Sequence, residues 1–324
     1  MQAILALVGR RAVFAVLVLI LSSALVFAGT GILPGDALEV SIPPDQLDSI
    51  PPEELAARRA ELGLDRPPHE RYLTWLAGAM RLDFGVTILN REPVFDMIAR
   101  PLLNTLLMAA VGLLVVPGAA FALGVWAALK PGGRVDAVIS SVALLGYSIP
   151  EFVLGNVLVL IFAVWLPWQP AVITLPTDAP PLALLAVLTL PIATLFLAST
   201  AYQLRLVRTA MISVLASDFV ERARLAGLSE WRVVLRHALP VAAIPALAAT
   251  AQFVAALVSG LLVIEIVFNY PGLGVRVVEA IGSRDVGVIQ AIGFLAALGV
   301  LATNLLADIA IIALDPRVRS STRD

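Results

Sequence analysis

The residues best suited to chemistry are a basic run in the second half of the chain and one isolated carboxylate in an apolar stretch. Between Arg205 and His237 there are six arginines against three acids, a net charge of +3. Such an excess suits binding to an acidic protein surface or to anionic phospholipid. Glu151 follows Pro150 and is surrounded by apolar residues. A charge in such a place must face protein or a water-filled cavity, because an apolar medium penalises it.

Other kinds of site are excluded by composition. The chain has no cysteine, so it can form neither a disulfide nor a thiolate metal site. Its two histidines, His69 and His237, are far apart, and no metal site is predicted. No G-x-x-x-x-G-K-[ST] sequence is present, so the chain has no P-loop for ATP. No Ser–His or paired-aspartate set lies in the apolar stretches, as an intramembrane protease would need, and no nucleic-acid partner is expected.

The chain is too apolar for a soluble protein. Of its 324 residues, 60% are hydrophobic and 14% are charged, and the mean hydropathy is +0.94. A soluble domain has about 25% charged residues, and a helix needs roughly 20 apolar residues to cross a bilayer. The pattern predicts an all-α integral membrane protein with six transmembrane helices, at Ala12–Leu33, Leu102–Leu129, Ala137–Leu166, Leu182–Leu204, Ala238–Val267 and Val286–Leu314.

The first of these stretches follows Arg10 and Arg11, so a cleaved secretory signal is an alternative. Its apolar run exceeds the ~7–15 residues of a signal core, which favours a retained helix. With the N-terminus inside, the ends and short loops have thirteen basic residues inside and two, Arg276 and Arg284, outside. This positive-inside bias predicts that both termini are cytoplasmic.

The segment 34–100 is the one sizeable soluble part and is predicted to lie outside. It has twelve acids and seven arginines, a net charge of −5. Two short helices are predicted in it, at Glu53–Leu62 and His69–Leu82, the second with an apolar face that includes Tyr72 and Trp75. Both are too small for a core of their own, so we expect a cap on the outer ends of the membrane helices.

The basic run itself has the pattern of a helical elbow. Asp218 and Glu221 match a capping box for a helix over Phe219–Ala226. Gly227 suits the left-handed position that ends a helix. Ser229 can begin a second helix, Glu230–Leu239, which runs into Pro240. The alternative is an ordinary basic juxtamembrane loop that binds anionic lipid.

The run SDFVERARLAGLSEWRVVLRHALPVAAIP resembles the EAA loop of ABC importer permeases. The residues on the pattern are Glu221, Ala223, Gly227, Leu239 and Pro240. Arg222 and His237 depart from the general pattern and are similar to the variants usual in the peptide-transporter branch.

The resemblance covers nearly the whole chain and suggests the B-type inner-membrane component of the dipeptide/oligopeptide (peptide/nickel) transport family. Further matches are LPGD at Leu33–Asp36, ELGLDRPPHERYLTWL, LDFG at Leu82–Gly85, VFNYPGLG at Val267–Gly274 and NLLADIAIIALDPRVR at Asn304–Arg319. It implies a type I ABC importer permease fold. The segments are then 1–33 (N-terminus and first helix), 34–100 (external), 101–314 (five-helix permease core, with the coupling loop at 205–237) and 315–324 (cytoplasmic tail).

The same resemblance implies a mechanism and partners. The loop docks on an ATP-hydrolysing subunit and couples it to the membrane helices, with Glu221, Arg222, Ala223, Arg224, Gly227, Leu239 and Pro240 as the coupling residues. Partners are a second permease subunit, the ATPase subunits that bind ATP and Mg, an external solute-binding protein and membrane lipid. The chain itself is expected to be no enzyme, to hold no cofactor and to lie in the bacterial inner membrane.

The cargo stays open between dipeptides or oligopeptides and nickel, glutathione or an oligosaccharide, which similar permeases import. An ion-coupled secondary transporter is a remote alternative, which inverted repeats and several mid-membrane acids would indicate. Two hypotheses remain for Glu151: it lines the pathway near a substrate amino group, or it binds backbone groups freed by a helix break. Asn104, Glu265, Asn304 and Asp308 are predicted to make helix–helix contacts.

Overall fold

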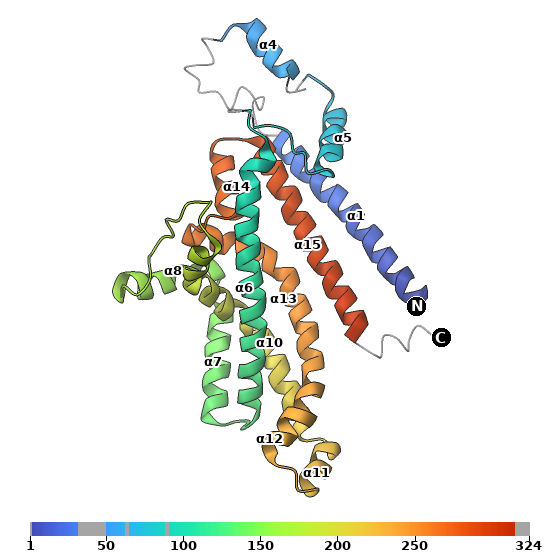
Figure 1. The fold of residues 1–324 in the computed structure, drawn as a ribbon, viewed down its shortest axis with the longest axis vertical. Helices are drawn as coiled ribbons and strands as arrows, with labels where there is room; N and C mark the ends of the chain where they lie inside the picture. Colours follow the sequence, from blue (N-terminus) through green and yellow to red (C-terminus); the bar gives the residue numbers. More distant parts are fainter. Residues whose placement is uncertain (1, 32–49, 62–64, 88–90, 315–324) are drawn as a thin grey trace.

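The computed structural model describes residues 2–31, 50–61, 65–87 and 91–314 (Figure 1). Within these ranges the chain is helical, apart from loops and one isolated antiparallel bridge between Val86 and Pro93. The helices are α1 (Gln2–Gly31), α4 (Pro52–Glu61), α5 (Pro68–Ala79), α6 (Val94–Ala128), α7 (Arg134–Ser148), α8 (Glu151–Val159), η1 (Leu160–Trp165), α9 (Pro181–Ala186), α10 (Thr189–Leu215), α11 (Asp218–Leu225), α12 (Glu230–Val233), η2 (Val234–Ala238), α13 (Leu239–Phe268), α14 (Leu273–Gly282) and α15 (Val286–Leu314).

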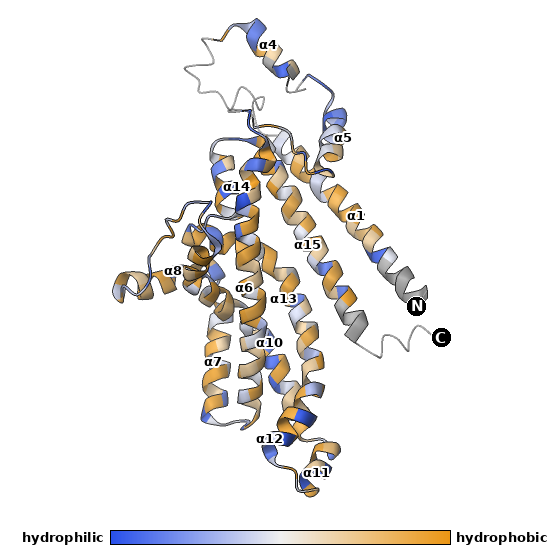
Figure 2. Ribbon diagram, in the orientation of Figure 1, coloured by the Kyte–Doolittle hydropathy of each residue, from blue (hydrophilic) through white to orange (hydrophobic). Residues whose placement is uncertain are grey.

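Five helical stretches of the described residues are long and apolar enough to cross a membrane, and the ribbon in Figure 2 is coloured mostly as hydrophobic along them. They are Gly9–Gly31, Val94–Ala128, Thr189–Leu215, Glu230–Val258 and Val286–Ile309. Two bent pairs also qualify, α7 with the α8–η1 helix and the end of α13 with α14. The predicted all-α membrane class is confirmed, and the number of six membrane helices stays a prediction.

The predicted membrane helix Ala137–Leu166 is broken at Pro150 into two helices. α7 ends at Ser148, α8 begins at Glu151, and the two directions differ by 109°. The cause is Pro150, which lacks an N–H group and disfavours the helical conformation of the residue before it. Ile149 is accordingly extended, with φ −103° and ψ 130°. Glu151 therefore lies at a corner of the chain.

The fourth predicted membrane helix, Leu182–Leu204, differs from the structure at both ends. Its beginning is the separate short helix α9, and Pro191 lies in the first turn of α10, where its missing N–H is not needed. At the other end α10 continues to Leu215. The loop predicted at 205–237 thus begins inside α10, and both Arg205 and Arg208 are helical.

The other predicted membrane helices agree more closely with the structure. α13 and α15 match Ala238–Val267 and Val286–Leu314 to within one residue at each end. α6 contains the predicted Leu102–Leu129 but begins earlier, at Val94, and α1 begins before the predicted Ala12.

The predicted loop helix Glu230–Leu239 is continuous with the membrane helix that follows. α12, η2 and α13 succeed one another without a break from Glu230 to Phe268. η2 is a π-helical turn, in which the N–H of Leu239 bonds to the carbonyl of Val234. This wider turn immediately precedes Pro240, which cannot donate a backbone hydrogen bond. α12 and α13 are therefore parts of one uninterrupted helical stretch.

α10 is at the centre of the bundle and packs against α6, α7, α8 and α13. Small residues permit these contacts: a Cβ on Gly124 of α6 would lie 2.9 Å from the carbonyl oxygen of Leu204. Leu195 of α10, Met108 of α6 and Leu257 of α13 belong to one buried cluster. This close backbone approach is typical of membrane helices.

α1 and α15 form a pair beside this bundle. Arg11 of α1 makes an ion pair with Asp308 of α15, and Gln290 of α15 donates to Thr30 at the other end of α1, at 2.8 Å. The two helices are therefore antiparallel, so the beginning of α1 and the end of α15 lie at the same end of the molecule (Figure 1).

The segment that was predicted to be external contacts this pair through α5. Tyr72 donates to the carbonyl of Ile20, and Trp75 lies edge-on to Phe294 with ring centroids 5.9 Å apart. The predicted helices at Glu53–Leu62 and His69–Leu82 correspond to α4 and α5. Both lie at the opposite end of the molecule from α11 and α12 (Figure 1). The match at Leu33–Asp36 and the tail 315–324 lie outside the described residues.

Candidate functional site

The turn between α11 and α12 depends on a glycine. Gly227 has φ +80°, in the left-handed region that residues with a side chain adopt only at a cost. Its N–H bonds to the carbonyl of Arg224 at 2.9 Å, and the N–H of Leu228 bonds to the carbonyl of Ala223 at 3.3 Å. These bonds satisfy the last carbonyls of α11 and reverse the chain toward α12.

The predicted capping box at the start of α11 is not formed. The residue before the helix is Ser217, and Asp218 lies in the first turn. Ser217 donates its hydroxyl to the carbonyl of Val214 at 2.5 Å and makes no side-chain cap. α11 begins one residue earlier than predicted, directly after the short turn that follows α10. Ser229 precedes α12 as predicted, also without a side-chain cap.

Arg224 holds the elbow together. Its Nε and Nη2 atoms lie 2.8 Å and 3.2 Å from the two carboxylate oxygens of Glu230, and its Nη1 donates to the carbonyl of Leu215 at 3.4 Å. One guanidinium thus connects α11, α12 and the end of α10. Arg222, the other arginine of α11, is also exposed and has no ion pair among the described residues.

Buried apolar residues fix the elbow on the bundle. Val220 of α11 and Val233 of α12 are completely buried. Val234 and Ala238 of η2 share a buried cluster with Met211 of α10, and this cluster also includes Ala128 of α6 and Ala242 of α13. The elbow is therefore packed on α10 and attached by the chain to both α10 and α13.

The outer surface of the elbow is unusually apolar for a segment rich in arginine. Leu225 is 82% exposed and Trp231 is 69% exposed, and Phe219 is partly exposed. Glu221 is also exposed, whereas Ala223 is half-buried. Two of the predicted coupling residues, Leu239 and Pro240, lie at the start of α13. They are therefore at the base of the elbow and not in its exposed turn.

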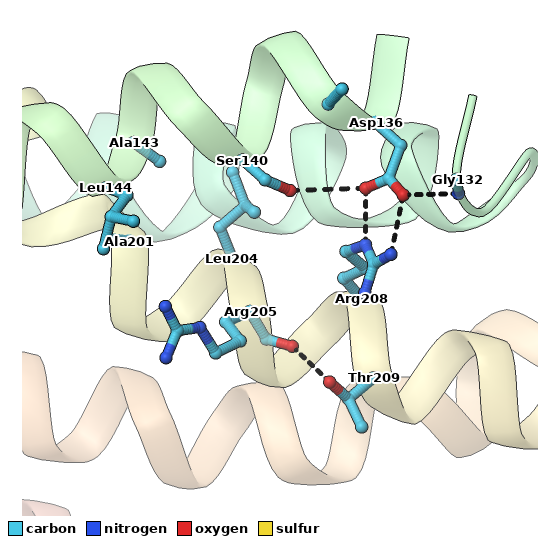
Figure 3. Close-up of a pocket in the computed structure, with 11 residues that line it drawn as sticks. Gly132, Asp136, Ser140, Ala143, Leu144, Ala201, Leu204, Arg205, Arg208 and Thr209 are labelled. Atoms are coloured by element: carbon cyan, nitrogen blue, oxygen red, sulfur yellow. Dashed lines mark hydrogen bonds and ion pairs between the residues drawn. The ribbon is translucent and has the colours of Figure 1, made fainter. Parts of the chain in front are cut away.

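An ion pair between α7 and α10 was not predicted from the sequence. Asp136 in the first turn of α7 accepts two hydrogen bonds from Arg208 of α10, at 2.5 Å and 2.6 Å (Figure 3). The N–H of Gly132 and the hydroxyl of Ser140 also bond to this carboxylate, at 2.8 Å and 3.3 Å. Asp136 is buried, so all four donors converge on a charge shielded from water. The only sequence signal was an acid directly before a predicted membrane helix.

A second buried network surrounds Glu265, near the end of α13. Its carboxylate, which is completely buried, accepts the Thr105 hydroxyl at 2.6 Å and the N–H of Gly274 at 2.6 Å. The N–H of Leu273 bonds to the Thr105 oxygen at 2.9 Å. Glu265 thus binds backbone groups at the start of α14, where a negative charge is stabilised. The sequence motif VFNYPGLG indicated this turn, but nothing in the sequence indicated that Thr105 of α6 contacts it.

Asn104 of α6 makes hydrogen bonds to the same turn. Its side-chain amide donates to the carbonyls of Pro271 and Thr177, at 2.7 Å and 3.0 Å, and Tyr270 donates to its backbone carbonyl at 3.1 Å. Asn104 therefore connects α6 to the bend before α14, which measures 74°.

Glu151 is the first residue of α8 and faces α13. A Cβ on Gly260 would lie 2.9 Å from Glu151 Oε2, so the glycine makes room for the carboxylate. Among the described residues no hydrogen bond or ion pair to Glu151 is present, and the side chain is half-buried. Asn156, the nearest amide along α8, donates to the carbonyl of Phe152 at 2.7 Å.

Comparison with known proteins identifies one family model that matches residues 120–320, described as the binding-protein-dependent transport system inner membrane component. A probable peptide ABC transporter permease of Sinorhizobium fredii is 30% identical over 96% of this chain and 98% of the relative. A putative peptide transport system permease of Brucella abortus is 34% identical over 97% of this chain and 99% of the relative. A glutathione transport system permease of Salmonella choleraesuis is 33% identical over 93% of this chain and 94% of the relative.

Proposed function

The chain belongs to the family of inner-membrane components of binding-protein-dependent transport systems, and we propose that its α11–α12 elbow is the surface on which a partner ATPase subunit docks. The observation that carries this proposal is the attachment of the elbow. It joins α10, the central helix of the bundle, to the continuous α12–η2–α13 helix. A displacement of the elbow is therefore passed on to α10 and α13, because no flexible linker separates them from it.

The exposed apolar residues support docking of a protein. Covering a fully exposed leucine such as Leu225 stabilises a complex by about 1.5–3 kcal/mol. Trp231 offers a still larger apolar surface, and tryptophan is enriched among the residues that dominate interfaces. Glu221 and Arg222 surround this surface with charge that can select a partner.

The orientation follows from the elbow and from charge. On this proposal the elbow faces the cytoplasm, in agreement with the basic excess of the inside segments. Because α1 and α15 are antiparallel, both termini are then cytoplasmic. α4 and α5, at the opposite end, face the external solute-binding protein (Figure 1).

The rest of the proposed transporter consists of partner subunits. ATP and Mg bind to the ATPase subunits, because this chain has no P-loop sequence. A second permease subunit pairs with this chain, and the translocation pathway lies between the two. The chain itself contributes coupling and pathway residues and catalyses no reaction.

Peptides are the proposed cargo. Relatives named as peptide permeases match nearly the full length of the chain. The glutathione permease of Salmonella choleraesuis keeps glutathione as a second candidate, and glutathione is itself a small peptide. Nickel and oligosaccharides remain the alternatives to be tested with the same complex. Glu151 is the proposed pathway residue, since a peptide presents an ammonium group that an unpaired carboxylate can bind.

The docking proposal is tested with Leu225→Asp and, as a matched control, Leu225→Met. Both variants keep α11, because position 225 is exposed, but only aspartate places a charge in the proposed interface. We expect Leu225→Asp to lose co-purification of the ATPase subunits and ATP-dependent dipeptide uptake, while Leu225→Met retains both. An ATPase that stays bound to Leu225→Asp, with normal uptake, would contradict the proposal.

A further inference from the structure

A groove between α7 and α10 lies close to the elbow and is unused by the coupling mechanism. Its volume is about 440 Å³. Figure 3 shows its two walls, with Ser140 and Leu144 on α7 and Ala201 and Arg205 on α10. The groove is hollow because small residues face it, including Ala143 and Ala201.

The groove has a polar end and an apolar end. Gly132, Asp136, Arg208 and Thr209 line the part near the start of α7 and the end of α10. The apolar residues Ala143, Leu144, Ala201 and Leu204 line the part farther along both helices. On the proposed orientation the polar end is at the cytoplasmic surface and the apolar end is deeper in the membrane.

The deep end is closed by a close contact between the helices. A Cβ on Gly146 of α7 would lie 2.5 Å from the carbonyl oxygen of Leu197 of α10. A molecule in the groove therefore cannot pass between the helices. Beside the deep end, Leu144 and Leu145 of α7 are 48% and 65% exposed, which provides an apolar surface on which an acyl chain can lie.

The charge around the polar end is positive. The carboxylate of Asp136 is paired with Arg208, so this ion pair contributes no net charge. Arg205 lines the groove, and Lys130 and Arg134 lie two residues before and after the lining residue Gly132 in the sequence. All three are exposed, and among the described residues none makes an ion pair. The groove lining thus contains one cation without an ion-pair partner among the described residues, Arg205, beside an apolar channel.

We propose that this groove binds one anionic phospholipid of the cytoplasmic leaflet, with its phosphate against Arg205 and an acyl chain along the apolar wall. Basic pockets between membrane helices on the cytoplasmic side have the chemistry that anionic head groups require. The apolar wall selects a lipid over free phosphate, because the phosphate alone leaves that wall exposed to water. The inference rests on the proposed orientation, but not on the docking of the ATPase.

The bound lipid would also bridge α7 and α10 beside the Asp136–Arg208 contact. Its presence would hold the two helices in register at the level where α10 leads into the elbow. Lipid composition would then affect transport through this site and not through the bilayer as a whole.

The test is native mass spectrometry of the complete complex extracted from nanodiscs that contain phosphatidylglycerol and phosphatidylcholine. The variants are Arg205→Gln, which removes the phosphate contact, and Ala201→Phe, which fills the apolar wall. The matched control is Arg10→Gln, which removes an exposed arginine from α1, outside the groove and the elbow. A basic residue near an anionic membrane surface contributes about 1 kcal/mol, or roughly fivefold in affinity.

We expect Arg205→Gln to reduce retained phosphatidylglycerol about fivefold, in keeping with that contribution. Ala201→Phe should reduce it as well, and Arg10→Gln should leave it unchanged. Competition by inorganic phosphate should have no effect. Equal retention in all variants would overturn the proposal, as would a photo-crosslinker at position 205 that labels the second permease subunit instead of lipid. The lipid readout is independent of ATPase binding, so its failure can be distinguished from failure of the docking proposal.

Discussion

Asp136 of α7 and Arg208 of α10 form a bidentate ion pair with N–O distances of 2.5 Å and 2.6 Å. The pair joins two membrane helices at the level where α10 approaches the elbow. Because Asp136 is buried and Arg208 is only partly exposed, the contact is better shielded than a surface salt bridge. It connects α7 to the helix that leads into the elbow.

Replacing Asp136 by asparagine should destabilise the protein, because Arg208 is left without a counter-charge. Removing one partner of a buried pair costs about 3–5 kcal/mol, and the partial exposure of Arg208 favours the lower end. The measurement is unfolding of the purified complex in detergent. Ser140→Ala serves as the control, since it removes only the 3.3 Å hydrogen bond to the same carboxylate.

A double variant, Asp136→Asn with Arg208→Gln, should recover part of the lost stability, because no unpaired charge remains. If Asp136→Asn is as stable as Ser140→Ala, the ion pair does not hold α7 and α10 together.

The turn before α14 should not tolerate a side chain at Gly272. A Cβ there would collide with the carboxylate of Glu265, which is held by Thr105 and Gly274. Forcing an extra carbon into a packed site costs about 1–3 kcal/mol. We expect Gly272→Ala to lower the unfolding temperature of the complex. Gly282→Ala is the control, because open space surrounds that glycine. Equal effects of the two substitutions would show that Glu265 can move away freely.

A helix was predictable from the sequence where its bounds depend on the length of an apolar stretch, on the absence of proline within it, or on a glycine at its end. The apolar stretch Val286–Leu314 is long and contains no proline, and the structure has a helix with these bounds. Gly227 indicated the turn of the elbow, because a left-handed residue at the end of a helix favours glycine. The family resemblance placed the same glycine in a coupling loop.

The remaining features depend on contacts that sequence periodicity does not reveal. Asp136 and Arg208 are separated by 72 residues, and Thr105 and Glu265 by 160. Pro150 was recognised as a break, but the 109° angle is set by packing of α8 on α10 and α13. The predicted cap, Asp218, lies inside α11, and Ser217, which precedes the helix, makes no side-chain cap.

Glu151 should influence which peptides are carried if it lines the pathway. Glu151→Gln keeps the size of the side chain and removes its charge. We expect it to slow ATP-dependent uptake of dipeptides with a free amino group, and to have little effect on the same peptides after N-acetylation. The readout is the ratio of the two uptake rates in proteoliposomes.

Gly260→Ala provides a second test of the same site, since a Cβ there would lie 2.9 Å from Glu151 Oε2 and displace the carboxylate. It should change the uptake ratio in the same direction. A ratio that neither substitution alters would leave Glu151 with a structural role at the start of α8.

The most direct test of the account is ATP-dependent peptide uptake by the complete complex with Gly227→Pro and Gly227→Asn. Proline cannot adopt φ +80° and removes the N–H bonded to Arg224, whereas asparagine tolerates the left-handed conformation. The account predicts that both variants assemble in the membrane, that Gly227→Pro abolishes uptake, and that Gly227→Asn retains most of it. Uptake by an assembled Gly227→Pro complex equal to that of Gly227→Asn would contradict the coupling role of the elbow.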